Sequence, residues 1–332
     1  MSYSEKILII NSSSIGDFIL SLPVLFAIRN NFPRAYIEIM GKSDVLELVE
    51  NRFYADKGIS VEIKGLYNFF IKKENLPDFL VNYFKSFDKI YTFLNDGEGI
   101  FLENLKRTNV EEIYFLKKSF PETFKNHAIK EYSKILKPLG IEIRIERPKI
   151  ILNKHDRNFA ENFIKANKFI KQGDICIAIH PGSGSKKKNW DFDNFIELSE
   201  KLKSEFKCNI LLLSGPAEDD KFIKDKDGFI NVRGLSLIKL ASVLEKCSLY
   251  IGNDSGITHL SSALGIPVIA IFGPTNRDIW KPIGNDVRVI YKGISCSPCR
   301  REKMYTCAEQ KCLNSIYANE VFEGCKSLLT KS

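Results

Sequence analysis

The feature that most restricts how this chain can fold is a recurring pattern: a short apolar run, a loop that often contains glycine, and then an amphipathic stretch. The apolar runs of strand length are, in chain order, residues 7–10, 36–40, 89–93, 175–179, 210–213, 249–252 and 268–272. Short apolar runs that alternate with amphipathic segments are typical of parallel strands joined by helices. The sequence therefore predicts an α/β protein with doubly wound parallel sheets.

The chain has 332 residues, which is more than one domain usually holds, so two domains are expected. Amphipathic helices are expected at residues 18–31, 192–206, 238–246 and 257–264, with a final helix at 315–329. The segment 139–168 separates two series of strand–helix units and has few glycines. We therefore expect a first domain at residues 1–165, a second at 166–314 and a terminal helical segment at 315–332.

The charge balance favours anionic partners. The chain carries 49 Lys and Arg against 41 Asp and Glu, and this net charge of +8 suits phosphorylated ligands, acidic lipids or nucleic acid. It has no helix-turn-helix or zinc-finger spacing and no basic helix interleaved with aromatic residues, so no nucleic-acid partner is expected. No signal peptide and no run of about 18 apolar residues is visible. These features predict a cytoplasmic protein.

Ligands bind open parallel sheets at the loops that leave the carboxyl ends of the strands. Here those loops contain neither a Walker A sequence nor a G-x-G-x-x-G fingerprint, so kinase, GTPase and nicotinamide dehydrogenase activities lose their usual support. The loop at residues 252–259 (GNDSGITH) lies between a strand and a helix. Gly256 permits close backbone approach, and the free amides of the helix start suit a phosphate. The alternative is that Asp254 or Ser255 only caps the helix.

Two further loops of the second series carry charge. Residues 180–190 (HPGSGSKKKNW) place three lysines beside two glycines, where positive charge could stabilise a diphosphate leaving group; a solvated lysine run is the alternative. Residues 214–220 follow a strand and include Glu218, whose carboxylate could accept hydrogen bonds from ribose hydroxyls. An acidic residue also suits a helix start for dipole reasons alone.

The first loop of the chain, residues 11–17, places Asp17 at the entry to a helix. A carboxylate that faces a cleft between two domains could act as the general base that deprotonates an acceptor hydroxyl. The alternative is a helix-capping role.

Four of the eight cysteines lie close together near the end of the sequence: Cys296, Cys299, Cys307 and Cys312. Without a signal peptide, reduced thiols or metal ligands are favoured over disulfides. A C-x2-C pair followed by two more thiols could form a structural zinc or iron–sulfur site. Reduced structural thiols, or a disulfide formed only on oxidation, are equally compatible with this spacing.

Taken together, the loop motifs resemble those of glycosyltransferase family 9, the lipopolysaccharide heptosyltransferase family. The motifs that carry this resemblance are, in chain order, residues 13–17 (SSIGD) with Leu22-Pro23, residues 180–182 (HPG) with 188–190 (KNW), residues 214–216 (SGP), residues 254–260 (DSGITHL), residues 272–275 (FGPT) and residues 280–282 (WKP). They span nearly the whole chain in the family's order.

The resemblance implies a GT-B fold, in which two Rossmann-like domains face each other across a cleft. The N-terminal domain would bind the acceptor and the C-terminal domain the nucleotide sugar, with the final helix packing back toward the first domain. It also implies an inverting, metal-independent transfer that requires no cofactor. Asp17 would be the base and Lys188 would neutralise the diphosphate; the lysine run leaves that assignment open by one position, and the spacing to Trp190 favours Lys188.

The resemblance extends to two sets of binding residues. The donor-side residues would be Ser183, Lys188, Glu218, Asp254, Ser255, Gly256 and His259. The acceptor-side residues would be Ser13, Ser14 and Gly16.

The implied activity is transfer of a sugar, a heptose from ADP-heptose, onto a lipopolysaccharide inner-core or related glycolipid acceptor. The protein would act as a peripheral protein at the cytoplasmic face of the inner membrane, which suits its basic balance. Two alternatives keep the fold: a transferase for another nucleotide sugar, and a nucleotide-sugar epimerase or hydrolase that needs no acceptor. A third is a non-catalytic binding or metal-responsive module that depends on the cysteine cluster.

Overall fold

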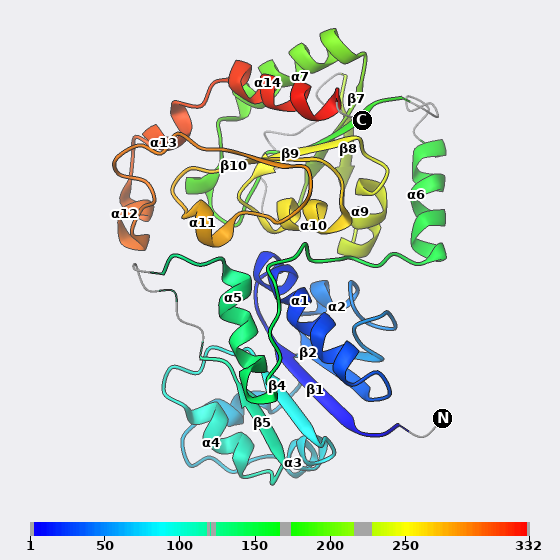
Figure 1. Ribbon diagram of the computed structural model, residues 1–332, viewed down its shortest axis with the longest axis vertical. Helices are drawn as coiled ribbons and strands as arrows, with labels where there is room; N and C mark the ends of the chain where they lie inside the picture. Colours follow the sequence, from blue (N-terminus) through cyan, green and yellow to red (C-terminus); the bar gives the residue numbers. More distant parts are fainter. Residues whose placement is uncertain (1–2, 118–119, 121–123, 167–173, 216–227, 331–332) are drawn as a thin grey trace. The chain divides into compact units, whose positions relative to one another are not determined.

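A computed structural model describes residues 3–117, 120, 124–166, 174–215 and 228–330 of the chain. The chain forms two compact units, unit 1 at residues 1–145 and unit 2 at residues 146–332 (Figure 1). Each unit contains one sheet in which all paired strands run parallel. The prediction of an α/β protein with parallel sheets is confirmed.

Unit 1 has a five-stranded sheet in the order β3-β2-β1-β4-β5. Its strands are β1 (Lys6–Asn11), β2 (Tyr36–Gly41), β3 (Lys57–Ser60), β4 (Lys89–Thr92) and β5 (Glu112–Phe115). Its helices are α1 (Ile15–Asn31), α2 (Ser43–Leu46), α3 (Asp78–Lys85), α4 (Ile100–Lys106) and α5 (Ala128–Ser133), with the 3-10 helices η1 (Leu66–Phe70) and η2 (Lys134–Leu139).

The core of unit 1 forms because alternate apolar side chains of the sheet meet the apolar faces of helices. Leu8 and Ile10 of β1 pack with Phe69 of η1, Phe84 of α3 and Phe101 of α4, and all five side chains are fully buried. Helix α1 packs against α5. The start of α1 is therefore held both by β1, which precedes it, and by a helix from much later in the chain.

Unit 2 has a six-stranded sheet in the order β11-β10-β9-β6-β7-β8. Its strands are β6 (Cys176–His180), β7 (Asn209–Ser214), β8 (Ile230–Arg233), β9 (Leu249–Asn253), β10 (Val268–Ile271) and β11 (Val287–Ile290). Its helices are α6 (Lys154–Ala166), η3 (Lys186–Lys188), α7 (Phe192–Phe206), α9 (Leu237–Leu244), α10 (Gly256–Leu264), α11 (Arg277–Trp280), α12 (Arg301–Thr306), α13 (Lys311–Asn314) and α14 (Ala318–Leu329).

Helices cover both faces of the sheet of unit 2, with α7 and α14 on one face and α9 and α10 on the other (Figure 1). Val321, Cys325 and Leu328 of α14 join the same buried cluster as Leu198 of α7 and Ile251 of β9. The apolar stripe of α14 therefore completes the core of unit 2. That the final helix packs back toward the first domain stays a prediction. The helix begins at residue 318 rather than 315.

Helix α6 belongs to unit 2, so the boundary between the units lies before this helix rather than at residues 165–166. The physical reason is that α6 packs along α9. Arg157 of α6 also forms a two-bonded ion pair with Glu245, with nitrogen–oxygen distances of 3.0 and 2.9 Å.

Both sheets reverse their strand order at one point, between β1 and β4 in unit 1 and between β6 and β9 in unit 2. The loops that leave the carboxyl ends of two such strands run in opposite directions and leave room for a ligand. Apart from Glu218, which follows β7 and lies outside the described residues, the candidate site residues of the first and second series lie in or directly after these loops, which follow β1, β6 and β9. Within the described ranges, no helix has the length and apolar character needed to cross a bilayer.

Candidate active site

The start of α10 is built to present backbone N–H groups. Ser255 caps the helix, and its hydroxyl accepts a hydrogen bond from the Thr258 amide at 3.3 Å. The Thr258 hydroxyl donates to the Asn253 carbonyl and lies 3.0 Å from Ser255 Oγ and 3.1 Å from Tyr250 Oη. The capping interpretation of Ser255 is therefore confirmed, and it does not exclude binding, because the other first-turn amides keep no intrahelical partner.

Lys188 and Asp254 form an ion pair at the point where the strand order of unit 2 reverses. Lys188 Nζ lies 3.1 Å from Asp254 Oδ2, and Thr275 Oγ1 donates to the same oxygen at 2.8 Å. Asp254 is only 6% exposed, whereas the Lys188 side chain is 21% exposed. The Asp254 carboxylate thus holds the Lys188 ammonium group next to Ser255, the residue that caps α10.

The side chains of the three lysines of η3 have three different environments. Lys187 Nζ donates to the Cys307 carbonyl at 2.7 Å, Lys188 contacts Asp254, and Lys186 is exposed. A 3-10 helix has three residues per turn, so consecutive side chains point in three directions. This geometry favours Lys188 over its two neighbours as the lysine that could face a diphosphate.

The loop after β6 is fastened to the end of β9 by the side chain of Asn253. Asn253 Nδ2 donates to the Pro181 carbonyl at 2.6 Å, and the Trp190 amide donates to Asn253 Oδ1 at 3.0 Å. The Trp190 indole N–H donates to the Ile316 carbonyl at 2.9 Å. Because Asn253 is fully buried, these bonds fix the loop that carries Lys188 relative to α10.

The other donor-side residues fall into three groups. Ser183 lies inside the loop after β6, with its hydroxyl 2.6 Å from Asn189 Oδ1 and 2.8 Å from the Ser185 carbonyl, which shapes the loop. Gly256 opens α10, and His259 lies one turn further on, 6% exposed. Glu218 lies outside the described residues.

Asp17 lies in the first turn of α1, and each of its carboxylate oxygens accepts a hydrogen bond from a hydroxyl group. Ser14 Oγ donates to Oδ2 at 2.8 Å, and Tyr132 Oη of α5 donates to Oδ1 at 2.6 Å. Each carboxylate oxygen can accept a second hydrogen bond. The carboxylate is therefore fixed in orientation by two donors and still able to accept a proton.

Tyr132 is a site residue that the sequence analysis missed. Burial, and then the neighbouring Asp17 carboxylate, raise the pKa of the Tyr132 phenol well above its ordinary value. The phenol therefore remains a hydrogen-bond donor to Asp17 throughout the pH range in which proteins are usually stable. No local pattern could reveal this contact, because the two residues are 115 positions apart.

The acceptor-side residues surround Asp17 in different ways. The Ser13 amide donates to Asn11 Oδ1 at 3.2 Å, which shapes the turn between β1 and α1. Ser14 is exposed and bonds Asp17 directly, and Gly16 is half-buried in the first turn of α1.

The four cysteines of the cluster are free: Cys296, Cys299 and Cys307 are partly exposed, and Cys312 is buried. In the part of the chain that the structure describes, no group of three or more His, Cys, Asp or Glu side chains is placed to hold a metal ion, and all eight cysteines are free. Burial raises the pKa of Cys312 to about 11, and burial also raises the pKa of Cys299, with the neighbouring Cys296 and Cys307 adding to that rise.

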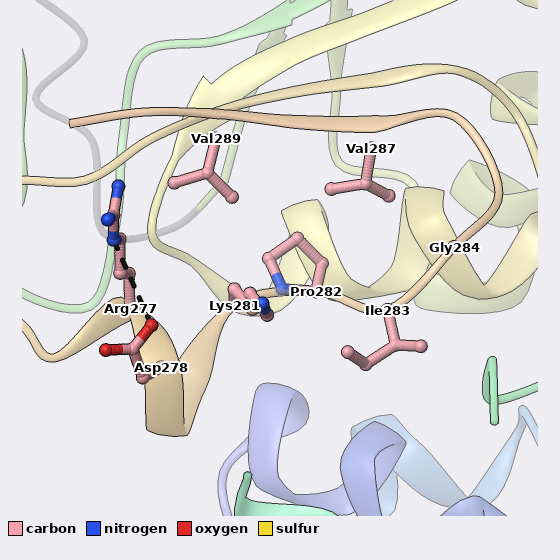
Figure 2. A pocket seen from close by; sticks show the side chains of 8 residues that line it. All are labelled: Arg277, Asp278, Lys281, Pro282, Ile283, Gly284, Val287 and Val289. Carbon is pink, nitrogen blue, oxygen red and sulfur yellow. Dashed lines mark ion pairs between the residues drawn. The ribbon is translucent and has the colours of Figure 1, made fainter. Parts of the chain in front are cut away.

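A pocket of about 360 Å³ lies beside α11 and β11 (Figure 2). Pro282, Ile283, Val287 and Val289 line it, together with charged side chains that include Arg277. It contains none of the predicted site residues, and it lies at the edge strand of the sheet. We therefore place the candidate site at the strand ends of β6 and β9, where the charged groups and helix amides meet.

Solved structures share this fold. The crystal structure of a glycosyl transferase family 9 protein from Veillonella parvula has a TM-score of 0.79 at 19% identity, covering 100% of this chain and 99% of that chain. The structure of E. coli ADP-heptose lps heptosyltransferase II has a TM-score of 0.73 at 18% identity, with coverage of 98% and 99%. The two parallel sheets and these neighbours define a protein with the GT-B fold.

The chain belongs to glycosyltransferase family 9 (heptosyltransferase), whose family model matches residues 105–311. A full-length relative is lipooligosaccharide heptosyltransferase 2 of Campylobacter jejuni subsp. jejuni serotype O:2. It is 24% identical over 351 aligned residues, which cover 98% of this chain and 99% of the relative. The resemblance inferred from the loop motifs is confirmed, and the protein is a glycosyltransferase.

Proposed function

We propose that this glycosyltransferase moves a heptose from ADP-heptose onto the inner core of lipopolysaccharide or a related glycolipid. Family membership supports the reaction class, and the E. coli enzyme with the same fold is named for this donor and acceptor. The observation that carries the proposal is the Lys188–Asp254 pair beside the first turn of α10. It brings a cation close to helix amides, which is the arrangement that a diphosphate requires.

On the donor side, Lys188 would stabilise the negative charge that develops on the diphosphate as the bond to the sugar breaks. The first-turn amides of α10 would bind the phosphate oxygens, with His259 one turn away. Ser183, Gly256 and Asp254 would shape this site, and Glu218 would contact the ribose. No metal ion or cofactor takes part in the proposed reaction.

On the acceptor side, Asp17 would take the proton of the attacking hydroxyl, with Ser13, Ser14 and Gly16 around it. The hydroxyl oxygen forms a bond to the anomeric carbon while the bond from that carbon to the diphosphate breaks, which inverts the configuration. The nucleoside diphosphate leaves, and the proton stays on Asp17 until solvent removes it. Unit 1 would bind the acceptor and unit 2 the donor, in the cytoplasm at the inner face of the inner membrane.

Calorimetric titration of the protein with ADP, UDP and GDP tests the donor. Selective binding of ADP is expected. Selectivity for UDP or GDP would contradict ADP-heptose while leaving the reaction class intact. Failure to bind any of the three would contradict the proposed donor site as a whole.

Replacement of Tyr132 by phenylalanine should lower kcat by about tenfold to a hundredfold, the effect of losing one hydrogen bond to a charged group. The KM for the donor should not change, because Tyr132 acts through Asp17 in unit 1. Steady-state kinetics with varied donor measures both constants.

The matched control is Tyr83→Phe. Tyr83 Oη donates to the buried carboxylate of Glu38 at 2.6 Å, the same distance that joins Tyr132 to Asp17, but it does so on β2 and away from the strand ends. Both variants should lose comparable thermal stability, and only Tyr132→Phe should lose turnover. Equal kcat in the two variants would assign Tyr132 a structural role alone.

Replacement of Cys296 and Cys299 by serine should leave nucleotide affinity and turnover within about twofold of the parent protein. The reason is that neither cysteine contacts the Lys188–Asp254 pair or Asp17 in the interactions described above. The same calorimetric titration and a transfer assay check this. Loss of nucleotide binding in the double variant, with the fold intact by circular dichroism, would favour the module that depends on the cysteines.

A further inference from the structure

Exposed apolar side chains of unit 1 are concentrated in one short segment of the chain. Nine large hydrophobic residues are exposed among the residues that the structure describes, and four of these lie between positions 67 and 79. They are Tyr67, Phe70, Ile71 and Phe79, with exposed fractions of 67, 43, 43 and 53%. Isolated exposed apolar residues are ordinary, whereas a concentration of them marks an interaction surface.

These side chains stand on and beside a closed loop, residues 65–77, which we call the apolar loop. Gly65 lies against the Pro77 ring at the base of the loop, and the Asn68 side chain donates to the Asn75 carbonyl at 3.2 Å across it. Tyr67 and Phe70 are three residues apart in η1, so they lie on the same side of this 3-10 helix. Phe79 follows the base of the loop by two residues.

The apolar loop is held rigidly against α4. The buried side chain of Asn104 donates to the carbonyls of Phe69 and Ile71 at 3.1 and 3.0 Å, and Arg107 donates to the Glu74 carbonyl at 3.0 Å. Phe69 is fully buried in the core of unit 1. The exposure of Phe70 and Ile71 is therefore fixed by the fold, and little conformational entropy is lost when they contact a partner.

The charge of the apolar loop identifies the kind of partner. The loop contains two lysines, Lys72 and Lys73, and one acidic residue, the half-buried Glu74, and the exposed Asp78 follows its base. Lys72 and Lys73 directly follow Phe70 and Ile71, and both are exposed and form no ion pair with any residue that the structure describes. Aromatic and aliphatic side chains next to lysines match the interface of an anionic bilayer, where the apolar groups enter the acyl boundary and the ammonium groups meet the headgroups.

We propose that the apolar loop, through Tyr67, Phe70, Ile71, Lys72 and Lys73, is the surface by which this protein contacts an anionic lipid bilayer. It belongs to the unit that would bind the acceptor, so docking there would concentrate the enzyme on the surface that carries a glycolipid acceptor. Only the last point, that docking brings the enzyme to its glycolipid acceptor, rests on the proposed function. The bilayer contact itself needs neither the donor nor the acceptor.

The test is flotation of the full-length protein with vesicles of phosphatidylcholine alone and of phosphatidylcholine with phosphatidylglycerol. The parent protein should bind the anionic vesicles and lose this binding at high salt. Phe70→Ser with Ile71→Ser should weaken binding by about tenfold or more. Lys72→Glu with Lys73→Glu should weaken it by about 25-fold or more, which is about fivefold for each lysine.

Two controls separate this surface from general charge and exposure. Lys42→Glu with Lys137→Glu makes the same change of charge at exposed positions elsewhere in unit 1, and Tyr317→Ser removes an exposed aromatic ring, 66% exposed, from unit 2. Both controls should bind like the parent protein. Asp17→Asn should also bind normally, so failure of the catalytic proposal and failure of this one are distinguishable.

Three results would overturn the proposal: no binding of the parent protein to anionic vesicles, equal losses in the loop and control variants, or normal vesicle binding by both loop variants. Sedimentation velocity of the parent protein and of the Phe70→Ser, Ile71→Ser variant tests whether the apolar loop contacts a second copy of the chain. If the parent protein is a dimer and this variant a monomer, with vesicle binding unchanged, the surface contacts a second copy of the chain instead.

Discussion

Replacement of Asp17 by asparagine is expected to lower the rate of sugar transfer by about 10³-fold, within the range that general base catalysis contributes. Asparagine keeps the size of the side chain and can still accept the Tyr132 hydrogen bond at its carbonyl oxygen, but it cannot take a proton from the acceptor. Replacement by alanine should have an effect at least as large. Nucleotide affinity, measured by calorimetry, should be unchanged in both variants because the proposed donor residues lie in unit 2.

The matched control is Asp44→Asn, which makes the same change in the first turn of α2, where the side chain is exposed. This variant should turn over like the parent protein. A transfer rate for Asp17→Asn within about threefold of the parent rate would remove this carboxylate from the chemistry. The hydrogen bonds from Tyr132 and Ser14 to Asp17 would then have a structural role: they would hold α5 and the loop before α1 against the start of α1.

The second large effect is expected for Lys188→Ala. Removal of one group that stabilises developing negative charge lowers turnover by about 10²- to 10³-fold, and the lost charge-assisted hydrogen bond should weaken nucleotide binding by about tenfold or more. Asp254 would keep its bond from Thr275 but lose its cation, so its carboxylate would repel an incoming diphosphate. Calorimetry with ADP and single-turnover kinetics measure the two losses separately.

The neighbouring lysines supply the controls for Lys188. Lys186→Ala removes an exposed lysine from the same turn, and Lys187→Ala removes one that is hydrogen-bonded to the Cys307 carbonyl. Neither should change nucleotide affinity by more than about twofold. If Lys187→Ala produced the larger loss, the diphosphate-binding role would move to that residue, and the ion pair with Asp254 would be structural.

The strands that the sequence predicted and those it missed differ in their place in the sheets. All seven apolar runs are interior strands, whereas β3, β5, β8 and β11 were not predicted and are the four edge strands. An edge strand needs no continuous apolar run, because it has a neighbour on one side only. The sequence of β8 is INVR and that of β3 is KGIS, and neither contrasts enough with the adjacent loops to be found by periodicity.

The candidate site was predictable where its residues are close together in the sequence. The loop after β9 could be recognised from residues 254–259, because the capping Ser255, Gly256 and the hydroxyl of Thr258 follow closely on one another there. The residues of the second loop alone left all three lysines open, because the direction of each side chain depends on where η3 begins, and only the spacing to Trp190 favoured Lys188. The ion pair of Lys188 with Asp254 was not predicted. The contacts of Tyr132 with Asp17 and of Thr275 with Asp254 could not be predicted, since each forms only after distant elements have packed. Thr275 was noted only as part of the motif at residues 272–275.

The position of α14 in the core of unit 2 has a consequence for the order in which the protein folds as the ribosome makes it. Unit 1 has every strand and helix of its own once residue 145 has left the exit tunnel, and it can form its core while the rest is being translated. Unit 2 cannot close one face of its sheet until Val321, Cys325 and Leu328 have emerged. Helix α7 covers part of that face early, but the apolar side chains of β9 and β10 that meet α14 stay uncovered from the synthesis of β10 until α14 emerges. This is the interval in which the chain most needs a chaperone.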